Sequence, residues 1–328
     1  MSLKKTAKSM LFRFPKSWID SFYRIYNIVF YPEMKEKKRS YGSLNPDKTF
    51  YVIRPRTDCI EGLMSLFINV LRQISYAEKK GYIPVVDFEN YDTQYKDESL
   101  KEKNVWNYYF TQPSDYDLKE VYKSKNVVLS GLNSYYKCYE FLNRDFNKIS
   151  LQRAHTFLQR YVDFSNAIKI LLKEELNIFR PQNSIGLYLR GTDYIALKPA
   201  GEPIQPTPKE AFKVVDSLLK KYSLKKVFIV TEDANYYKAA REYYNSALCK
   251  VSFDSFIKDY SGIDFLSKDS SVSQLASDPY ERGAQYLIKL ILLSQCRAIV
   301  GGKTCGSWMA CVMAEENVEK YIFEKGIY

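Results

Sequence analysis

The residues best suited to chemistry in this chain are an arginine and an aspartate that follow a short apolar run, in SIGLYLRGTDY (residues 184–194). The run at 185–189 predicts a buried strand, and parallel α/β sheets bind ligands at the carboxyl ends of their strands. A guanidinium at this place offers a planar set of donors that matches phosphate oxygens. The pattern therefore predicts that Arg190 binds phosphate and that Asp193 orients it, against the alternatives of a surface charge or a structural ion pair.

Two acidic residues end the next strand-like run, KVFIVTED (residues 226–233), and a helical pattern follows at 235–244. Glu232 and Asp233 are thereby predicted at the same sheet edge as Arg190. At that edge they are expected to contact the ribose or the base of a nucleotide.

A third short run, residues 298–300, leads into the turn GGKTCGS (301–307) and then into a predicted helix at 308–316. Backbone N–H groups and the dipole at a helix start both favour an anion. Thr304, Gly306 and Ser307 are therefore predicted to form a phosphate-binding turn. The alternative is a tight turn before a packed helix, and the spacing does not match a Walker P-loop.

These segments together resemble the α1,2/α1,6/protein-O-fucosyltransferase superfamily, whose members have a GT-B fold. The matching segments are YLRGTDY (188–194), TED (231–233), LSQ (293–295), the turn at 304–307, EGLMSLFIN (61–69) and the stretch at 76–87. The resemblance spans roughly residues 50–323. It implies an α/β, GT-B-like fold of two Rossmann-like domains around a cleft, and transfer of a sugar from a nucleotide donor.

The resemblance also assigns roles to single residues. It places Arg190 on the β-phosphate of the donor, and it places Gly62, Asn69 and Tyr188 in the donor site. Tyr188 stands where the family has a histidine, and Lys289 stands near a position where the family often has a carboxylate that reads guanine. GDP-fucose is therefore the first donor expected, and another nucleotide sugar stays open.

A catalytic base is expected from the same comparison, because some family members have a glutamate shortly after the R-x-x-D segment. Lys198 occupies that position without a gap, whereas Glu202 fits if the loop at 195–206 carries an insertion. Glu202 is the predicted base for an inverting transfer, in which a carboxylate takes the proton of the acceptor hydroxyl.

Composition excludes several other classes of site. The six cysteines show no C-x-x-C spacing and His155 is the only histidine, so no usual Cys/His zinc site or histidine-dependent hydrolase triad is expected. His155 falls in a helix-like stretch and is predicted to be a packed or surface residue. We expect no metal and no cofactor, although a metal-dependent transferase could use the D-x-D triplet at 115–117.

Positive charge is concentrated at the N-terminus. Residues 1–40 hold ten Lys/Arg against three Asp/Glu, which is seven of the eleven net positive charges, interleaved with aromatic side chains. Such a segment is typical of a helix at an anionic membrane surface or of a helix packed on the first domain. Without a nucleic-acid-binding motif, a membrane span or a cleavage site, we expect a bacterial cytoplasmic enzyme that can lie on the inner membrane face.

The expected organisation is a basic amphipathic segment (1–45), an N-terminal α/β acceptor-side domain (46–178) and a C-terminal α/β nucleotide-sugar domain (179–328). In the first domain, strands are predicted at 50–53 and 84–88, a helix at 62–80, helical spacing at 151–176 and a linker at 177–184. The acceptor expected is a glycan or a lipid-linked oligosaccharide. The non-enzymatic alternative is a GT-B-like protein that binds a membrane or another polyanion without catalysis.

Overall fold

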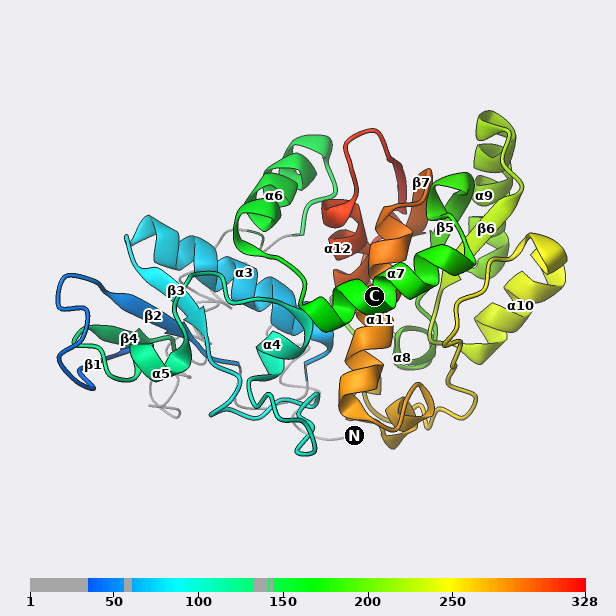
Figure 1. Cartoon of the computed structure of the whole chain (residues 1–328). Helices are drawn as coiled ribbons and strands as arrows, with labels where there is room; N and C mark the ends of the chain where they lie inside the picture. The colour runs from blue at the N-terminus through cyan, green and yellow to red at the C-terminus, as the bar shows by residue number, and fades with distance from the viewer. Residues whose placement is uncertain (1–34, 56–60, 132–140, 142–143) are drawn as a thin grey trace. The chain divides into compact units, whose positions relative to one another are not determined.

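The computed structural model describes residues 35–55, 61–131, 141 and 144–328. Within this part, the chain forms two compact units, each built around a four-stranded sheet (Figure 1). The α/β class predicted from the sequence is confirmed, with one sheet parallel throughout and the other parallel except for one edge strand. Most of the basic segment at 1–45 lies outside the described residues, so its predicted contact with a membrane stays a prediction.

Among the described residues, the first unit comprises 35–55, 66–92, 112–131 and 141. Its sheet has the order β1-β4-β2-β3, with β2 parallel to both β3 and β4 and with β1 antiparallel to β4. Its elements are β1 (Lys37–Arg39), β2 (Phe50–Ile53), α3 (Leu63–Lys79), β3 (Ile83–Val86), α5 (Leu118–Val121) and β4 (Val127–Leu129). The first three residues of α3 belong to the second unit. The predicted strands at 50–53 and 84–88 and the predicted helix at 62–80 are confirmed to within two residues.

Among the described residues, the second unit comprises 61–65, 93–111 and 144–328. Its sheet has the order β6-β5-β7-β8, and all the strands are parallel. Its strands are β5 (Ser184–Tyr188), β6 (Lys226–Val230), β7 (Ala298–Gly302) and β8 (Glu319–Phe323). Its helices are α4 (Val105–Tyr109), α6 (Lys148–Tyr161), α7 (Asn166–Ile178), α8 (Thr192–Leu197), α9 (Pro208–Tyr222), α10 (Ala234–Tyr244), α11 (Pro279–Ser294) and α12 (Cys305–Met313), with short 3₁₀ turns at Pro181–Asn183, Asn245–Ala247, Leu266–Lys268 and Ser270–Gln274.

The boundary between the two units differs from the domain boundary that the sequence predicts at residue 178. Helices α6 and α7 belong to the second unit, because they pack on α12 and α11. The helical stretch at 151–176 is two helices rather than one, since Ser165 caps a new helix by accepting from the backbone N–H of Ile168. The expected linker at 177–184 contains the end of α7 and a 3₁₀ turn.

Strand β5 is buried along its whole length and alternates its side chains between two helical layers. Ile185 and Leu187 pack in one core with residues of α9 and α10. On the opposite face, Gly186 lets α11 approach, because a Cβ there would lie 2.5 Å from Cδ1 of Leu293. This close packing fixes the rotation of α11 about its own axis, and with it the helix face that lies at the carboxyl ends of the strands.

Candidate functional site

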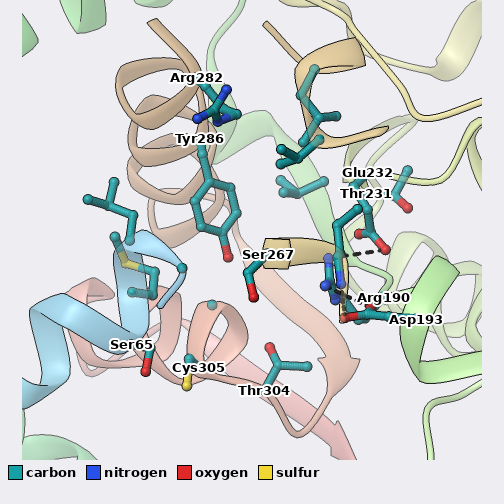
Figure 2. Close-up of a pocket in the computed structure, with 18 of the residues that line it drawn as sticks. Ser65, Arg190, Asp193, Thr231, Glu232, Ser267, Arg282, Tyr286, Thr304 and Cys305 are labelled. Carbon is teal, nitrogen blue, oxygen red and sulfur yellow. Dashed lines mark hydrogen bonds and ion pairs between the residues drawn. The ribbon is translucent and has the colours of Figure 1, made fainter. Parts of the chain in front are cut away.

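Arg190 lies just past the carboxyl end of β5, where the sequence predicts it. Its Nη2 is 2.8 Å from Oδ1 of Asp193 and its Nη1 is 3.2 Å from Oε1 of Glu232 (Figure 2). The guanidinium also lies over the ring of Tyr194, 5.6 Å from its centroid. The side chain is 19% exposed and lines a pocket. Two carboxylates and a ring therefore hold the guanidinium at the pocket wall.

The loop after Arg190 is strained and is held by the end of β6. Thr192 has a φ of +38°, which a β-branched residue rarely adopts. Oε1 of Glu232 accepts from the Gly191 N–H (2.9 Å) and from the Thr192 hydroxyl (2.9 Å), while Oδ2 of Asp233 accepts from the Thr192 N–H (3.1 Å). Such strain persists where the surroundings fix the backbone, so Glu232 and Asp233 both position the Arg190 loop.

Gly191 permits this arrangement through its missing side chain. A Cβ there would lie 2.4 Å from Oδ2 of Asp233 and 2.6 Å from its Cβ. Asp233 cannot move aside cheaply, because it caps α10 by accepting from the N–H groups of Asn235 and Tyr236. Asp233 is therefore placed beside the loop and away from the pocket lining, whereas Glu232 lines the pocket.

We expect Gly191→Ala to lower the free energy of unfolding by about 1–3 kcal/mol, the usual cost of overpacking. Thermal or urea unfolding measures this. The matched control is Gly62→Ala, where nothing lies within 4 Å of an added Cβ, and its stability should stay close to that of the natural protein. Equal stability of the two variants would contradict the tight contact between Gly191 and Asp233.

Both carboxylate oxygens of Asp193 are engaged by neighbouring groups. Its Oδ1 contacts Arg190 and accepts from the Tyr194 N–H (3.1 Å), and its Oδ2 accepts from the Leu266 N–H (3.0 Å). A carboxylate with both oxygens engaged is poorly placed to take a proton from a substrate. Asp193 is therefore placed to hold Arg190 and the neighbouring backbone, and its role in positioning Arg190 for a ligand stays a prediction.

Burial and charge act against each other in this cluster. Burial by itself would lower the pKa of Arg190, but the charges of Glu232 and Asp193 raise that pKa above its usual range. Burial raises the pKa of the Glu232 carboxyl, although the charge of Arg190 opposes the change. The guanidinium stays charged under all ordinary conditions, and its own partners offset that charge.

The turn after β7 forms the second wall of the pocket and starts α12. Thr304 caps this helix, since its Oγ1 accepts from the Ser307 N–H at 3.0 Å. The hydroxyl of Ser307 accepts from the Thr304 N–H (3.0 Å) and donates to the Gly302 carbonyl (2.6 Å). Thr304, Cys305 and Gly306 line the pocket, but Ser307 is fully buried and its hydroxyl serves the turn itself.

Two tyrosine hydroxyls meet at this turn. Tyr188, the last residue of β5, and Tyr286 of α11 have their hydroxyl oxygens 3.1 Å apart. A Cβ on Gly306 would lie 2.3 Å from the Tyr286 hydroxyl and 2.5 Å from that of Tyr188. Gly306 therefore lets both hydroxyls reach the start of α12, where free N–H groups favour an anion.

The pocket between these walls has a volume of about 310 Å³ and is formed entirely within the second unit. One face of α11 contributes Arg282, Gln285, Tyr286 and Lys289, which follow the i, i+3, i+4, i+7 spacing of a helix face. Figure 2 shows Arg282 and Tyr286 on successive turns of this helix. Apolar lining comes from Val230, Phe265, Leu266, Val272 and Leu275.

Lys289 lines the pocket but is directed into the protein by its neighbours. Its Nζ is 3.9 Å from Oδ1 of Asp254 and lies over the rings of Phe253 (5.8 Å) and Phe256 (5.6 Å). Burial lowers the pKa of its ammonium. Lys289 thus supplies a counter-ion to the Asp254 carboxylate, and it offers no acceptor to a base.

Glu202, the predicted base, lines the pocket and accepts a hydrogen bond from the Tyr194 hydroxyl at 3.1 Å. Lys198, the alternative position, ends α8 with a left-handed backbone (φ +43°) and does not line the pocket. Gly62 also lines the pocket, whereas Asn69 is buried in α3 and belongs to the first unit. The structure therefore gathers most of the predicted residues and leaves out Asp233, Ser307 and Asn69.

The other predicted features have structural roles. Oδ1 of Asp117, in the D-x-D triplet, caps α5 by accepting from the Glu120 N–H at 2.8 Å. Nδ1 of His155 donates to the Val312 carbonyl at 2.7 Å, as a packed histidine would. Within the described ranges, no group of three or more His, Cys, Asp or Glu side chains is placed to bind a metal, and no helix has the length and hydropathy to cross a bilayer.

Comparison with known proteins gives similarity to solved structures alone, since no protein-family model and no curated protein matches the chain. The fucosyltransferase NodZ from Bradyrhizobium is 14% identical over 77% of this chain and 88% of its own, with a TM-score of 0.41. POFUT1 in complex with GDP-fucose is 9% identical over 87% of this chain and 99% of its own, with a TM-score of 0.45. An arginine-to-lysine variant of Arabidopsis thaliana FUT1 in complex with GDP is 10% identical over 84% of this chain and 70% of its own, with a TM-score of 0.43. At these identities and scores, the similarity assigns neither a family nor a substrate to this chain.

Proposed function

We propose that this chain is an inverting, metal-independent glycosyltransferase that moves a sugar from a nucleotide donor to a glycan or lipid-linked oligosaccharide. The observation that carries the proposal is the placement of Arg190 in the same pocket as the Thr304–Gly306 turn, each at the carboxyl end of a parallel strand. A guanidinium and a helix start that face one pocket are suited to a diphosphate. GDP-fucose is the first donor to test, on the strength of the sequence resemblance.

In the proposed reaction, a proton leaves the acceptor hydroxyl and negative charge develops on the diphosphate. The acceptor hydroxyl oxygen attacks the anomeric carbon from the face opposite to the diphosphate, while the anomeric C–O bond breaks and its electron pair stays on the phosphate oxygen. The proton of the acceptor goes to Glu202, which Tyr194 holds by a hydrogen bond. Arg190 and the N–H groups of the turn stabilise the charge that grows on the departing diphosphate.

Arg190 is fitted to this role by the way it is held. Its contacts with Asp193 and Glu232 fix the guanidinium before any ligand arrives. Donors fixed in advance require no reorganisation as charge develops, which is why such donors lower barriers. The pocket's apolar residues give room for the nucleoside next to this polar wall.

We expect GDP or GDP-fucose to stabilise the protein in the absence of divalent metal. At about a hundred times the Kd, the added free energy of unfolding is roughly 2.7 kcal/mol. A thermal-shift series with GDP, UDP, CDP and ADP, each with and without EDTA, measures this. UDP, CDP or ADP outperforming GDP would reject the guanine donor. Stabilisation that disappears in EDTA would favour a metal-dependent transferase, and no stabilisation by any nucleotide would favour a non-catalytic binding protein.

A further inference from the structure

Arg282, in the first turn of α11, is a cation outside the sequence motifs that predict the pocket. It lines the pocket, with Nη1 donating to the Ala276 carbonyl (3.2 Å) and Nη2 to the Gln94 carbonyl (3.1 Å). Its guanidinium also lies near the ring of Tyr95, 5.9 Å from the centroid. These contacts fix its orientation, and all of them lie within the second unit.

The charge of Arg282 has no protein counter-ion in the described part of the chain. Its Nε is buried and has no hydrogen-bond acceptor there, and both of its donated bonds go to neutral carbonyls. The other two cations that line the pocket are paired, Arg190 with two carboxylates and Lys289 with Asp254. A partly buried charge without a partner is costly unless a ligand supplies the opposite charge.

A second positive charge is needed because Arg190 is already paired with Asp193 and Glu232. One guanidinium faces two carboxylates within 3.2 Å, so the cluster by itself carries no excess of positive charge. A diphosphate is a strong anion, and a site that holds it has to offset its charge. Arg282 is the lining residue whose charge is available for this purpose.

The position of Arg282 on α11 suits this role. Tyr286, four residues later, brings its hydroxyl to the start of α12, where a Cβ on Gly306 would meet it. Residues four apart in a helix lie on the same face, about one 5.4 Å turn from each other. Arg282 and the turn line the same pocket, and Tyr286 lies between them on this face of α11 (Figure 2).

We propose that Arg282 binds the diphosphate of the donor as a second arginine. It contacts the phosphate oxygens together with Arg190 and the Thr304–Gly306 turn. The inference rests on the proposed function, because it concerns the leaving group of the same reaction. When the anomeric C–O bond breaks and its electron pair stays on the diphosphate, Arg282 stabilises part of the added negative charge without transferring a proton.

The test is calorimetric titration of the full-length protein with inorganic pyrophosphate, GDP and guanosine. The variants are Arg282→Met and Arg282→Lys, with Arg241→Met as a matched control, since Arg241 is exposed on α10 and does not line the pocket. We expect Arg282→Met to weaken pyrophosphate and GDP by about tenfold or more, with guanosine unchanged. Arg282→Lys should recover part of the affinity, and the control should bind as the natural protein does.

Four outcomes separate the possibilities. Unchanged pyrophosphate binding in folded Arg282→Met overturns the inference. An equal loss of affinity for guanosine also overturns it, because Arg282 would then only hold the backbone of Ala276 and Gln94. Pyrophosphate binding that depends on Arg282, without GDP binding, keeps the inference and rejects the guanine donor. A natural protein that binds no diphosphate at all overturns both. If Arg282→Met does not fold, Arg282→Gln, which keeps two side-chain N–H donors, replaces it.

Discussion

Arg190→Lys is expected to lose nearly as much activity as Arg190→Ala, although the positive charge survives. The guanidinium reaches Asp193 and Glu232 at the same time, 2.8 and 3.2 Å away, and still lines the pocket. A lysine ammonium is one compact donor group and cannot keep this fork. Losing one preorganised donor typically costs about 3 kcal/mol in the transition state, a hundredfold or more in rate. Release of GDP from GDP-fucose gives the loss in kcat/KM.

Stability has to be followed beside activity, because Arg190 also pairs with buried carboxylates. Arg190→Ala leaves Glu232 and Asp193 without their counter-ion, and breaking a buried pair in this way costs about 3–5 kcal/mol of folding free energy. Arg190→Lys keeps the charge and should fold better than Arg190→Ala. A folded Arg190→Lys protein with near-normal turnover of donor would remove Arg190 from the catalytic site.

Glu202→Gln is expected to give the second large effect, a fall in kcat with donor affinity unchanged. Removing a general base typically costs about 10²–10⁴ in rate, and the amide cannot take the acceptor's proton. Glu202 lines the pocket and is held by Tyr194, so a glutamine of the same shape should leave the fold intact. Comparing kcat with the Kd for GDP in the same preparation separates the two effects.

Asp193→Asn is the matched control for Glu202→Gln. Both oxygens of Asp193 are occupied by Arg190 and backbone N–H groups, so its substitution should disturb the loop more than the proton transfer. We expect a lower melting temperature and a smaller loss of kcat than in Glu202→Gln. If Asp193→Asn abolishes turnover while Glu202→Gln is active, the base is Asp193 and the assignment is wrong.

The centre of the pocket could be predicted from the sequence because it depends on local patterns. An apolar run that stops at Arg190 fixes a strand end, and a Gly/Ser/Thr turn before a helix fixes the start of α12. The roles of Asp233 and Ser307 were harder to predict, since polar residues at helix starts serve as caps as readily as ligands. Both side chains satisfy backbone groups in the structure.

The face of α11 that lines the pocket could not be predicted from spacing alone. The helix is largely buried, so its apolar pattern does not show which polar residues meet a ligand. That face is fixed by contact between Gly186 of β5 and Leu293, which pairs residues more than a hundred positions apart. Arg282 and Tyr286 were missed for this reason. The packing of α6 and α7 on the second unit is equally non-local, which explains the difference at residue 178.

The most direct measurement is a crystal structure of the full-length protein grown with GDP and EDTA. We expect the nucleotide in the pocket of the second unit, with a β-phosphate oxygen within hydrogen-bond distance of the Arg190 guanidinium and of an N–H group at the start of α12. GDP bound elsewhere, or no nucleotide in this pocket at a saturating concentration, would contradict donor binding by Arg190 and the Thr304–Gly306 turn.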